Sequence, residues 1–187
     1  MLILASKSPR RQEILSQMGF SFRIADSEYE ENNALAVPPD QLVRLQAEGK
    51  AAAVYKRMGD GAVVIGADTL VVLDGKVLGK PRNEAQAMAM LKAFSGRTHE
   101  VMTGVAVWAN EHCWSDVCVS SVTFRPLTDE EIRRYVATGE PMDKAGAYGV
   151  QGLGRSMVDK VEGSLSNVIG LPRTLTKELI QKATGKR

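Results

Sequence analysis

The pattern of apolar residues along the chain predicts a β-sheet that contains one long antiparallel pair. Short runs of apolar residues, or alternation of apolar and polar residues, recur between turn signals. The predicted strands cover residues 2–6, 20–24, 62–66, 70–73, 76–78, 98–110, 113–125 and 157–161. Asp74-Gly75 is a typical hairpin turn, and the two longest strands are expected to pair with each other.

The segments between these strands predict helices, because apolar residues recur at helical spacing and helix-end residues flank them. Asn83 and Thr128 each begin a capping sequence, with Gln or Glu three residues later. The predicted helices cover residues 9–18, 40–58, 83–94, 128–138 and 172–184. The expected buried face of the longest helix consists of Leu42, Leu45, Ala52 and Ala53.

Helices and strands interleave, but a hairpin and a long antiparallel pair interrupt a pure parallel pattern. We therefore predict an α/β fold with a mixed sheet flanked by helices. The length of 187 residues suits one sizeable core, and no linker divides the chain. The prediction is a single domain over residues 1–187.

Charge and cysteine usage exclude several classes of protein. The chain has 24 Lys and Arg against 22 Asp and Glu, so a nucleic-acid polymer is not an expected partner. No apolar run reaches the length of a membrane span, and the first residues are too short for a signal peptide. Cys113 and Cys118 lie in a strand-like segment without a disulfide or zinc pattern, which favours a reducing cytoplasm.

The first candidate site follows the first strand. Ser8-Pro9 is expected to begin a helix, so Arg10 and Arg11 fall in its first turn. Cations are unfavourable there for the helix dipole, but two arginines beside free N–H groups suit an anion such as phosphate. Solvation, or pairing with Glu13, is the alternative.

Several charged residues have both a structural and a chemical interpretation. Asp68 lies in an apolar stretch, so it should end the strand at a cleft, pair with a cation or bind a metal; a simple turn is the alternative. Pro81 holds Lys80 extended. Lys80 and Lys50 could each be solvated, and Glu31 could be a solvated loop charge or a metal ligand.

A glycine-rich loop at 143–154 is the second unusual stretch. Its glycines suggest a backbone that bends closely around something, and the amide of Gln151 could read a base edge because it both donates and accepts. The chain contains neither a P-loop nor a dinucleotide-binding fingerprint. His99 and His112 have no partners at ligand spacing and are expected to be structural or exposed.

The ordered set of these stretches resembles the Maf family of nucleoside triphosphate pyrophosphatases. The matching segments are residues 4–11, 65–69, 79–81, 143–152 and 163–172. The resemblance implies an elongated, ITPase-like fold with a central cleft and, often, a homodimer. It also implies hydrolysis of a nucleoside triphosphate to monophosphate and pyrophosphate, a house-cleaning reaction, with Mg²⁺ or Mn²⁺.

The resemblance also assigns roles to particular residues. Asp68 is implied as the proton acceptor, with Glu31 and Lys80 also catalytic, and the metal ligands are Glu31 and Asp68. The implied substrate-binding residues are Ser6, Arg10, Arg11, Lys50, Thr69 and Gln151.

Three of these positions, namely Arg10, Thr69 and Gln151, distinguish subtypes. Here they are similar to the branch that acts on dTTP and UTP. The branch that acts on 7-methyl-GTP, and a nucleotide-binding regulator of septum formation, are the alternatives. The chain departs from the family pattern at Lys7 and, within the segment around Lys50, at Gln46 and Gly49.

Overall fold

The computed structural model describes residues 1–185, and its centre is a seven-stranded mixed sheet. The strands are β1 (Leu2–Leu4), β2 (Arg23–Ile24), β3 (Val63–Leu73), β4 (Lys76–Leu78), β5 (Thr98–Ala109), β6 (His112–Phe124) and β7 (Val158–Glu162). Their order is β2-β1-β3-β5-β6-β7, with β4 paired to β3. Only β1 forms parallel pairs, with β2 and β3, and β5 and β6 form the long antiparallel pair that the sequence predicts. Residues 186–187 of the predicted domain lie outside the described residues.

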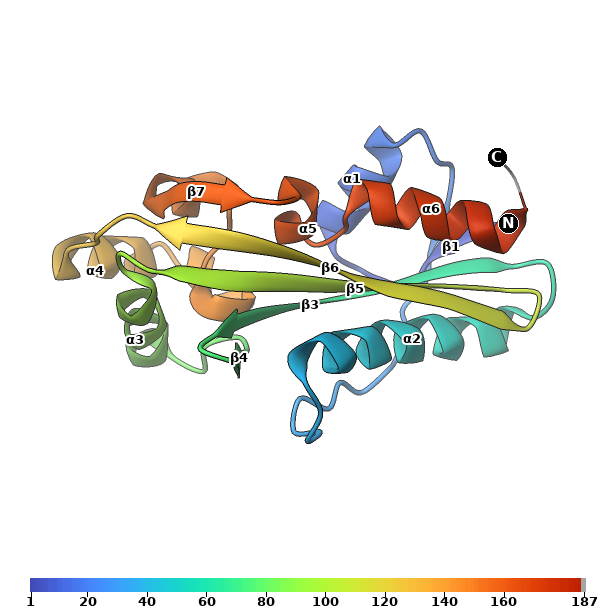
Figure 1. The fold of residues 1–187 in the computed structure, drawn as a ribbon, viewed down its shortest axis with the longest axis horizontal. Coiled ribbons are helices and arrows are strands. Elements are labelled where there is room, and N and C mark those ends of the chain that lie inside the picture. Colours follow the sequence, from blue (N-terminus) through green and yellow to red (C-terminus); the bar gives the residue numbers. More distant parts are fainter. Residues whose placement is uncertain (186–187) are drawn as a thin grey trace.

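Helices cover the sheet at both ends and on both faces, and the molecule is elongated along its long strands (Figure 1). The helices are α1 (Pro9–Gln17), α2 (Pro39–Met58), α3 (Glu84–Phe94), α4 (Asp129–Ala137), α5 (Leu165–Ile169) and α6 (Arg173–Thr184). In Figure 1, α2 lies below the sheet and α6 above it, while α3 and α4 lie at the left end of the molecule. The predicted class, a mixed sheet flanked by helices, is therefore confirmed.

The capping predictions also hold. The Asn83 side chain accepts a hydrogen bond from the backbone N–H of Gln86. Thr128 and Glu131 form the reciprocal capping box. The first turn of α4 also contains three acidic residues, which interact favourably with the positive end of the helix dipole. Of the predicted strand at 20–24, only Arg23–Ile24 forms β2, and these two residues pair in parallel with Ile3 and Leu4 of β1.

The predicted buried face of α2 is wrong in part. Leu42 is buried, but Leu45 is 41% exposed and Ala52 and Ala53 are only half-buried. The face on the sheet instead includes Ala47 and Ala51. An added Cβ at Gly66 of β3 would overlap the backbone of Ala47 and Ala51, so only glycine lets the helix lie this close. The close approach selects small residues for the interface rather than the larger Leu45.

The prediction that Asp68 ends a strand is also wrong. The predicted strands at 62–66 and 70–73 are one strand, β3, and Asp68 lies within it, opposite Gly104 of β5. An added Cβ at Gly104 would overlap the backbone of Val43, so this glycine also seats α2. A carboxylate can remain inside the strand because Lys50 of α2 reaches it, which is one of the outcomes that the sequence left open.

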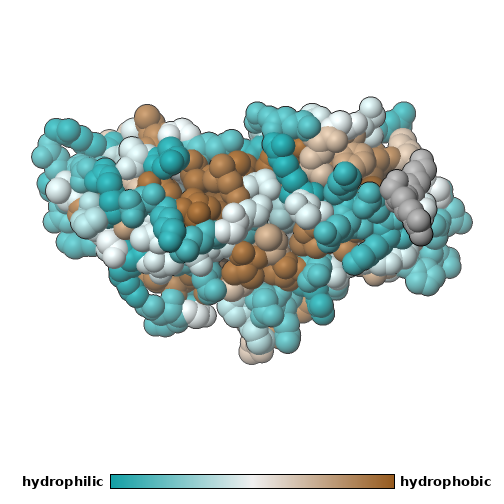
Figure 2. Space-filling view, turned by 45° about the horizontal axis from the view of Figure 1, so that its top comes forward, coloured by the Kyte–Doolittle hydropathy of each residue, from teal (hydrophilic) through white to brown (hydrophobic). Residues whose placement is uncertain are grey.

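The surface carries separate hydrophobic patches among hydrophilic residues. Figure 2 shows them in the middle of one face, while the two ends of that face are mostly hydrophilic. Within residues 1–185, no helix has the length and apolar character needed to cross a membrane.

Candidate active site

A cleft of about 780 Å³ opens beside the middle of the sheet, which is the size of a small-molecule site. It lies between the start of α1, the loop before α2, the strand β3 and the glycine-rich loop. The cleft brings together all of the site residues that the sequence predicts. They are Ser6, Arg10, Arg11, Glu31, Lys50, Asp68, Thr69, Lys80 and Gln151.

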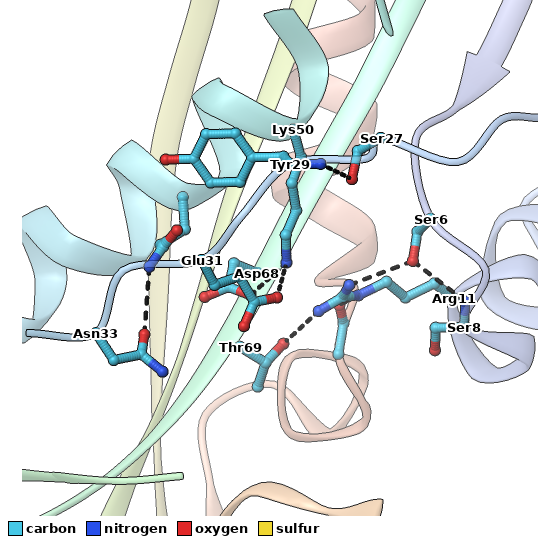
Figure 3. Close-up of polar contacts among 12 residues, drawn as sticks. Ser6, Ser8, Arg11, Ser27, Tyr29, Glu31, Asn33, Lys50, Asp68 and Thr69 are labelled. Atoms are coloured by element: carbon cyan, nitrogen blue, oxygen red, sulfur yellow. Dashed lines mark hydrogen bonds and ion pairs between the residues drawn. The ribbon is translucent and has the colours of Figure 1, made fainter. Parts of the chain in front are cut away.

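Lys50 lies between two carboxylates at the base of the cleft (Figure 3). Its Nζ is 2.6 Å from Glu31 Oε1 and 2.7 Å from Asp68 Oδ1. The side chains of Lys50 and Asp68 are 10% and 8% exposed, whereas that of Glu31 is 48% exposed. Asp68 is therefore a buried partner fixed by β3, and Glu31 reaches the same lysine from a loop on the solvent side.

The cations of the cleft keep Glu31 ionised. Its partial burial favours the protonated form, but the hydrogen bond from Lys50 and the charges of Lys50, Lys80 and Arg11 outweigh burial and lower the pKa of Glu31. Two carboxylates and one shared lysine leave a net negative charge at this point. That negative charge can attract a further cation, either a metal ion or another cationic side chain of the cleft, such as Lys80.

Arg11 is held in place by neutral acceptors. Its Nε donates to the carbonyl oxygen of Gly170 at 2.8 Å, and its terminal nitrogens donate to Ser6 Oγ at 3.3 Å and Thr69 Oγ1 at 3.1 Å. Thr69 is in turn fixed by Thr103, whose Oγ1 lies 3.0 Å away. These contacts orient the planar guanidinium from three directions (Figure 3).

The charge of Arg11 is not neutralised by an ion pair. Among residues 1–185, no carboxylate lies within ion-pair distance of it. Burial lowers the pKa of Arg11, and the charges of Asp68 and Glu31 oppose this effect. An oriented guanidinium without an anionic partner is suited to bind phosphate.

Arg10, Lys80 and Gln151 line the outer part of the cleft. Lys80 and Gln151 are exposed, and Pro81 beside Lys80 is buried, so the lysine extends from a fixed point of the backbone. Arg10 and Gln151 also line a smaller adjoining hollow of about 330 Å³. Lys80 and Gln151 are thus the exposed part of the lining, in contrast to the buried Lys50–Asp68 pair.

The glycine-rich loop is anchored on both sides of Gln151. Oε1 of Glu140 accepts from the N–H of Gly154 at 3.0 Å and from the hydroxyl of Tyr135 at 2.9 Å, and its Oε2 accepts from the N–H of Leu153 at 3.1 Å. The Tyr135 hydroxyl also accepts from the N–H of Gly149 at 3.3 Å. Burial favours the protonated acid, but these backbone hydrogen bonds lower the pKa of Glu140, so the anchor is ionised.

The sequence did not single out four further side chains that line the cleft. They are Tyr29, Asp143, Lys144 and Tyr148. Lys144 Nζ bonds Asp143 Oδ1 at 2.8 Å and the carbonyl oxygen of Glu140 at 2.9 Å, so this lysine is fixed to the loop. The unusual composition at 143–152 pointed to this loop, but not to these side chains. Only the fold brings them into the same cleft as Arg10, Arg11 and Lys80.

The two histidines occupy the positions that their sequence context predicts. His99 is 2% exposed and its Nε2 lies 2.6 Å from the hydroxyl of Tyr148, while His112 is exposed on β6. Burial lowers the pKa of His99 to about 4. His99 is therefore neutral near pH 7 and packs among Phe94, Phe124 and Tyr148.

The carboxylates of the cleft could contribute to a metal site but not complete one. Asp68 Oδ2 is buried and has no hydrogen-bond partner within residues 1–185, so it is a free hard ligand. Among these residues, no group of three or more His, Cys, Asp or Glu comes together in a metal-binding arrangement. A site for Mg²⁺ or Mn²⁺ would thus use Asp68 and Glu31 together with water and phosphate oxygens, which fits the preference of Mg²⁺ for such ligands.

The cleft thus combines several cationic side chains with a buried carboxylate, an arrangement that suits a strongly anionic small molecule. The chain belongs to the Maf family, because residues 1–183 match the family described as Maf-like protein.

Curated relatives match the chain along nearly its whole length. A protein of Photorhabdus laumondii is 46% identical over 181 residues, which cover 97% of this chain and 93% of the relative. A protein of Escherichia coli is 47% identical over 186 residues, with 100% and 94% covered, and one of Shigella dysenteriae is 48% identical over 187 residues, with the same coverage. Each of these relatives is named dTTP/UTP pyrophosphatase.

Solved structures share the fold at low sequence identity. A HAM1 protein from Coxiella burnetii aligns with a TM-score of 0.54 at 13% identity and covers 100% of this chain and 98% of its own. The Staphylococcus aureus Ham1 protein aligns with a TM-score of 0.50 at 12% identity, covering 97% and 90%. The predicted membership of the family and the ITPase-like fold are thereby confirmed.

Proposed function

We propose that this protein hydrolyses dTTP and UTP to the nucleoside monophosphate and pyrophosphate. The observation that carries the proposal is a single cleft in which an unneutralised guanidinium and a buried, partly free carboxylate face the same space. The names of the relatives, which are about 47% identical, support the same reaction and substrates.

The cations of the cleft would bind the triphosphate. Arg11 is oriented for a bidentate contact, and Lys80 and Arg10 can add charge from the mouth. Lys50 would act mainly on the carboxylates that it contacts, because it forms an ion pair with each of them. The positive groups would stabilise the charge that accumulates on the departing pyrophosphate.

Asp68 would accept the proton in the hydrolytic step. The oxygen of a water molecule attacks the α-phosphorus, the bond to the bridging oxygen breaks, and pyrophosphate leaves with that bond's electron pair. The proton of the water passes to Asp68 Oδ2, the carboxylate oxygen that has no partner within residues 1–185. Lys50, which also contacts Glu31, would orient Asp68 for this transfer through the ion pair to its Oδ1.

A divalent cation, Mg²⁺ or Mn²⁺, would supply further charge neutralisation at the phosphates. Glu31 would hold it through the oxygen that does not contact Lys50, and Asp68 would hold it through a water molecule, so that Oδ2 stays available for the proton.

Substrate preference would arise at the mouth of the cleft. Uracil and thymine present acceptor, donor and acceptor atoms along one edge, and the Gln151 amide offers both a donor and an acceptor. The loop that carries Gln151 is anchored by Tyr135 at Gly149 on one side and by Glu140 at Leu153 and Gly154 on the other. A base that leaves fixed polar groups unpaired would be rejected.

A panel of triphosphates tests this proposal. With Mg²⁺, we expect pyrophosphate as the first product and a higher kcat/KM for dTTP and UTP than for 7-methyl-GTP. Gln151→Ala should lose most of that preference while Gln41→Ala, an exposed position on α2, should keep it. Orthophosphate as the first product would reject the reaction, and 7-methyl-GTP as the best substrate would place the protein in the other branch.

The cellular setting is also part of the proposal. We infer a homodimer in the cytoplasm: hydrophobic patches are exposed on the face in Figure 2, and such patches are common at protein interfaces. Cys113 and Cys118 are both free thiols, as a reducing compartment requires. Sedimentation at several concentrations would detect the dimer, and a single monomeric species would exclude it.

A further inference from the structure

Two residues of α2 that depart from the family pattern contact the loop that carries Glu31. Gly49 lies against the ring of Tyr29, because an added Cβ there would overlap three atoms of that side chain. The Gln46 Nε2 donates to Asn33 Oδ1 at 3.2 Å. The contacts therefore fall two residues before and two residues after Glu31 in the loop.

The spacing of the contact residues along helix α2 matches their spacing along the loop. Residues 46, 49 and 50 lie on one face of α2, since they are separated by three and four positions. Residues 29, 31 and 33 alternate along an irregular, extended segment, and Figure 3 shows Tyr29, Glu31 and Asn33 beside this face of the helix. Each of the three loop residues thus meets its own helix partner, with the Glu31–Lys50 ion pair in the middle.

Apart from these contacts, the loop is held at its start, where Arg57 of α2 contacts the backbone of Asp26 and the side chain of Glu28, and Lys7 pairs with Asp26. Residues 30–36 are all exposed, and the segment between β2 and α2 contains no strand or helix. Glu31 itself is 48% exposed, and a half-exposed ion pair alone fixes a loop only weakly. A shift of about 1 Å at a reacting group can cost about 100-fold in rate, so the position of Glu31 needs additional support.

We propose that Gly49 and Gln46 form a latch for the loop, with Gly49 seating Tyr29 and Gln46 holding Asn33, and that this latch positions Glu31 against Lys50. The inference rests on the proposed function, in which Glu31 takes part in catalysis. Gly49 and Gln46 are positioning residues, because they act through the loop and not on the substrate. Gln46 suits this role because it is 1% exposed, so its amide is fixed by packing before it meets Asn33.

The substitution Gly49→Ala separates positioning from stability. Alanine favours a helix over glycine by about 1 kcal/mol, so the thermal midpoint should stay the same or rise. Its Cβ would nevertheless displace Tyr29, and we expect kcat to fall by about ten-fold. If Gly49 had a purely structural role, kcat would instead change in the same direction as the thermal midpoint.

Further variants complete the test. Gly49→Ala should have no further effect when combined with Tyr29→Ala, and Gln41→Ala, at an exposed position of α2 that does not line the cleft, should keep wild-type activity. In a Glu31→Ala background Gly49→Ala should likewise add nothing, because the residue that it positions is absent. Asn33→Ala should lower kcat by a smaller factor, since it removes one hydrogen bond.

The outcomes distinguish this inference from the proposed function. If Glu31→Ala lowers kcat but Gly49→Ala does not, the latch is rejected and the proposed function stands. If Glu31→Ala leaves kcat unchanged, the catalytic role of Glu31 is wrong and the latch falls with it. If Gly49→Ala lowers kcat equally with and without Glu31, the glycine acts through some other group, which also rejects the inference.

Discussion

Two buried polar pairs lie on neighbouring strands of the same sheet and differ in charge. Asp68 of β3 pairs with Lys50, and His99 of β5 bonds Tyr148. Asp68 is 5% exposed and His99 is 2% exposed, so burial alone does not distinguish them. The first pair is held by opposite charges at a cleft, whereas the second is enclosed by aromatic rings that favour neutral groups.

The free atom in each pair shows what this difference means. Asp68 Oδ2 and His99 Nδ1 are both buried without a hydrogen-bond partner within residues 1–185. Asp68 lines the cleft together with Arg10, Arg11 and Lys80, whereas His99 is not among the residues that line it. An unpartnered buried atom therefore indicates a site only where a ligand can reach it, and His99 instead supports the wall that Tyr148 gives to the cleft.

The largest effect that we expect comes from removing the charge of Asp68. Asp68→Asn should lower kcat by at least about 100-fold, the usual scale for a lost general base, while circular dichroism reports a folded protein. The amide keeps the size of the side chain but cannot accept the proton. Steady-state kinetics with dTTP and Mg²⁺ would measure the loss.

Asp159→Asn is a matched control, because Asp159 is an exposed strand residue that does not line the cleft. It should leave kcat unchanged. An unchanged kcat in a folded Asp68→Asn protein would show that Asp68 takes no part in the mechanism. The Asp68–Lys50 pair would then have only a structural role, like the His99–Tyr148 pair.

The next effect concerns His99 and the pH dependence of stability. The pKa of His99 is lowered to about 4 from an ordinary value of 6.5, because burial disfavours the charged ring. In the unfolded chain the ring takes up a proton below about pH 6.5, and in the folded protein only near pH 4. The free energy of unfolding should therefore fall between these values as pH decreases, by up to about 3 kcal/mol.

His99→Gln should remove this contribution. Glutamine is neutral throughout and can still bond the Tyr148 hydroxyl. Urea unfolding at pH 7 and pH 4.5 should show a smaller difference for His99→Gln than for the wild type, and His112→Gln, at an exposed position, should match the wild type. Equal pH dependence in the His99 variant would mean that the ring is solvated or charged in the folded state.

Much of the fold and of the site could be predicted from the sequence, but not the contacts that join distant segments. Local signals fixed the capping sequence at Thr128 and the hairpin turn at Asp74, since these depend on neighbouring residues. The continuity of β3 through Asp68 could not be predicted in this way, because the compensating charge comes from Lys50 on another element. The buried face of α2 was likewise set by two glycines on the sheet, Gly66 and Gly104, rather than by its own leucines.

The site residues show the same division. Arg11 was found because its first-turn position is unfavourable without an anion, and Asp68 because an apolar stretch surrounds it. Lys144 and Tyr29 were missed because neither position is unusual in its local sequence. Gly49 was noted only as a departure from a pattern, and its meaning required the position of the Tyr29 ring.

The smallest effect that we expect sharpens the comparison with a third group, Arg11, which is charged yet held by neutral acceptors. Arg11→Lys keeps the positive charge but cannot reach Gly170, Ser6 and Thr69 together, so the cation loses its fixed orientation. We expect KM for dTTP to rise by about ten-fold, equal to about 1.4 kcal/mol, with kcat changed less, and inhibition by pyrophosphate to weaken in parallel. Arg133→Ala, an exposed position on α4 away from the cleft, is the control and should leave KM unchanged. If Arg11→Lys only lowers the thermal midpoint and leaves KM and pyrophosphate inhibition unchanged, Arg11 belongs with His99 as a structural group and not with Asp68.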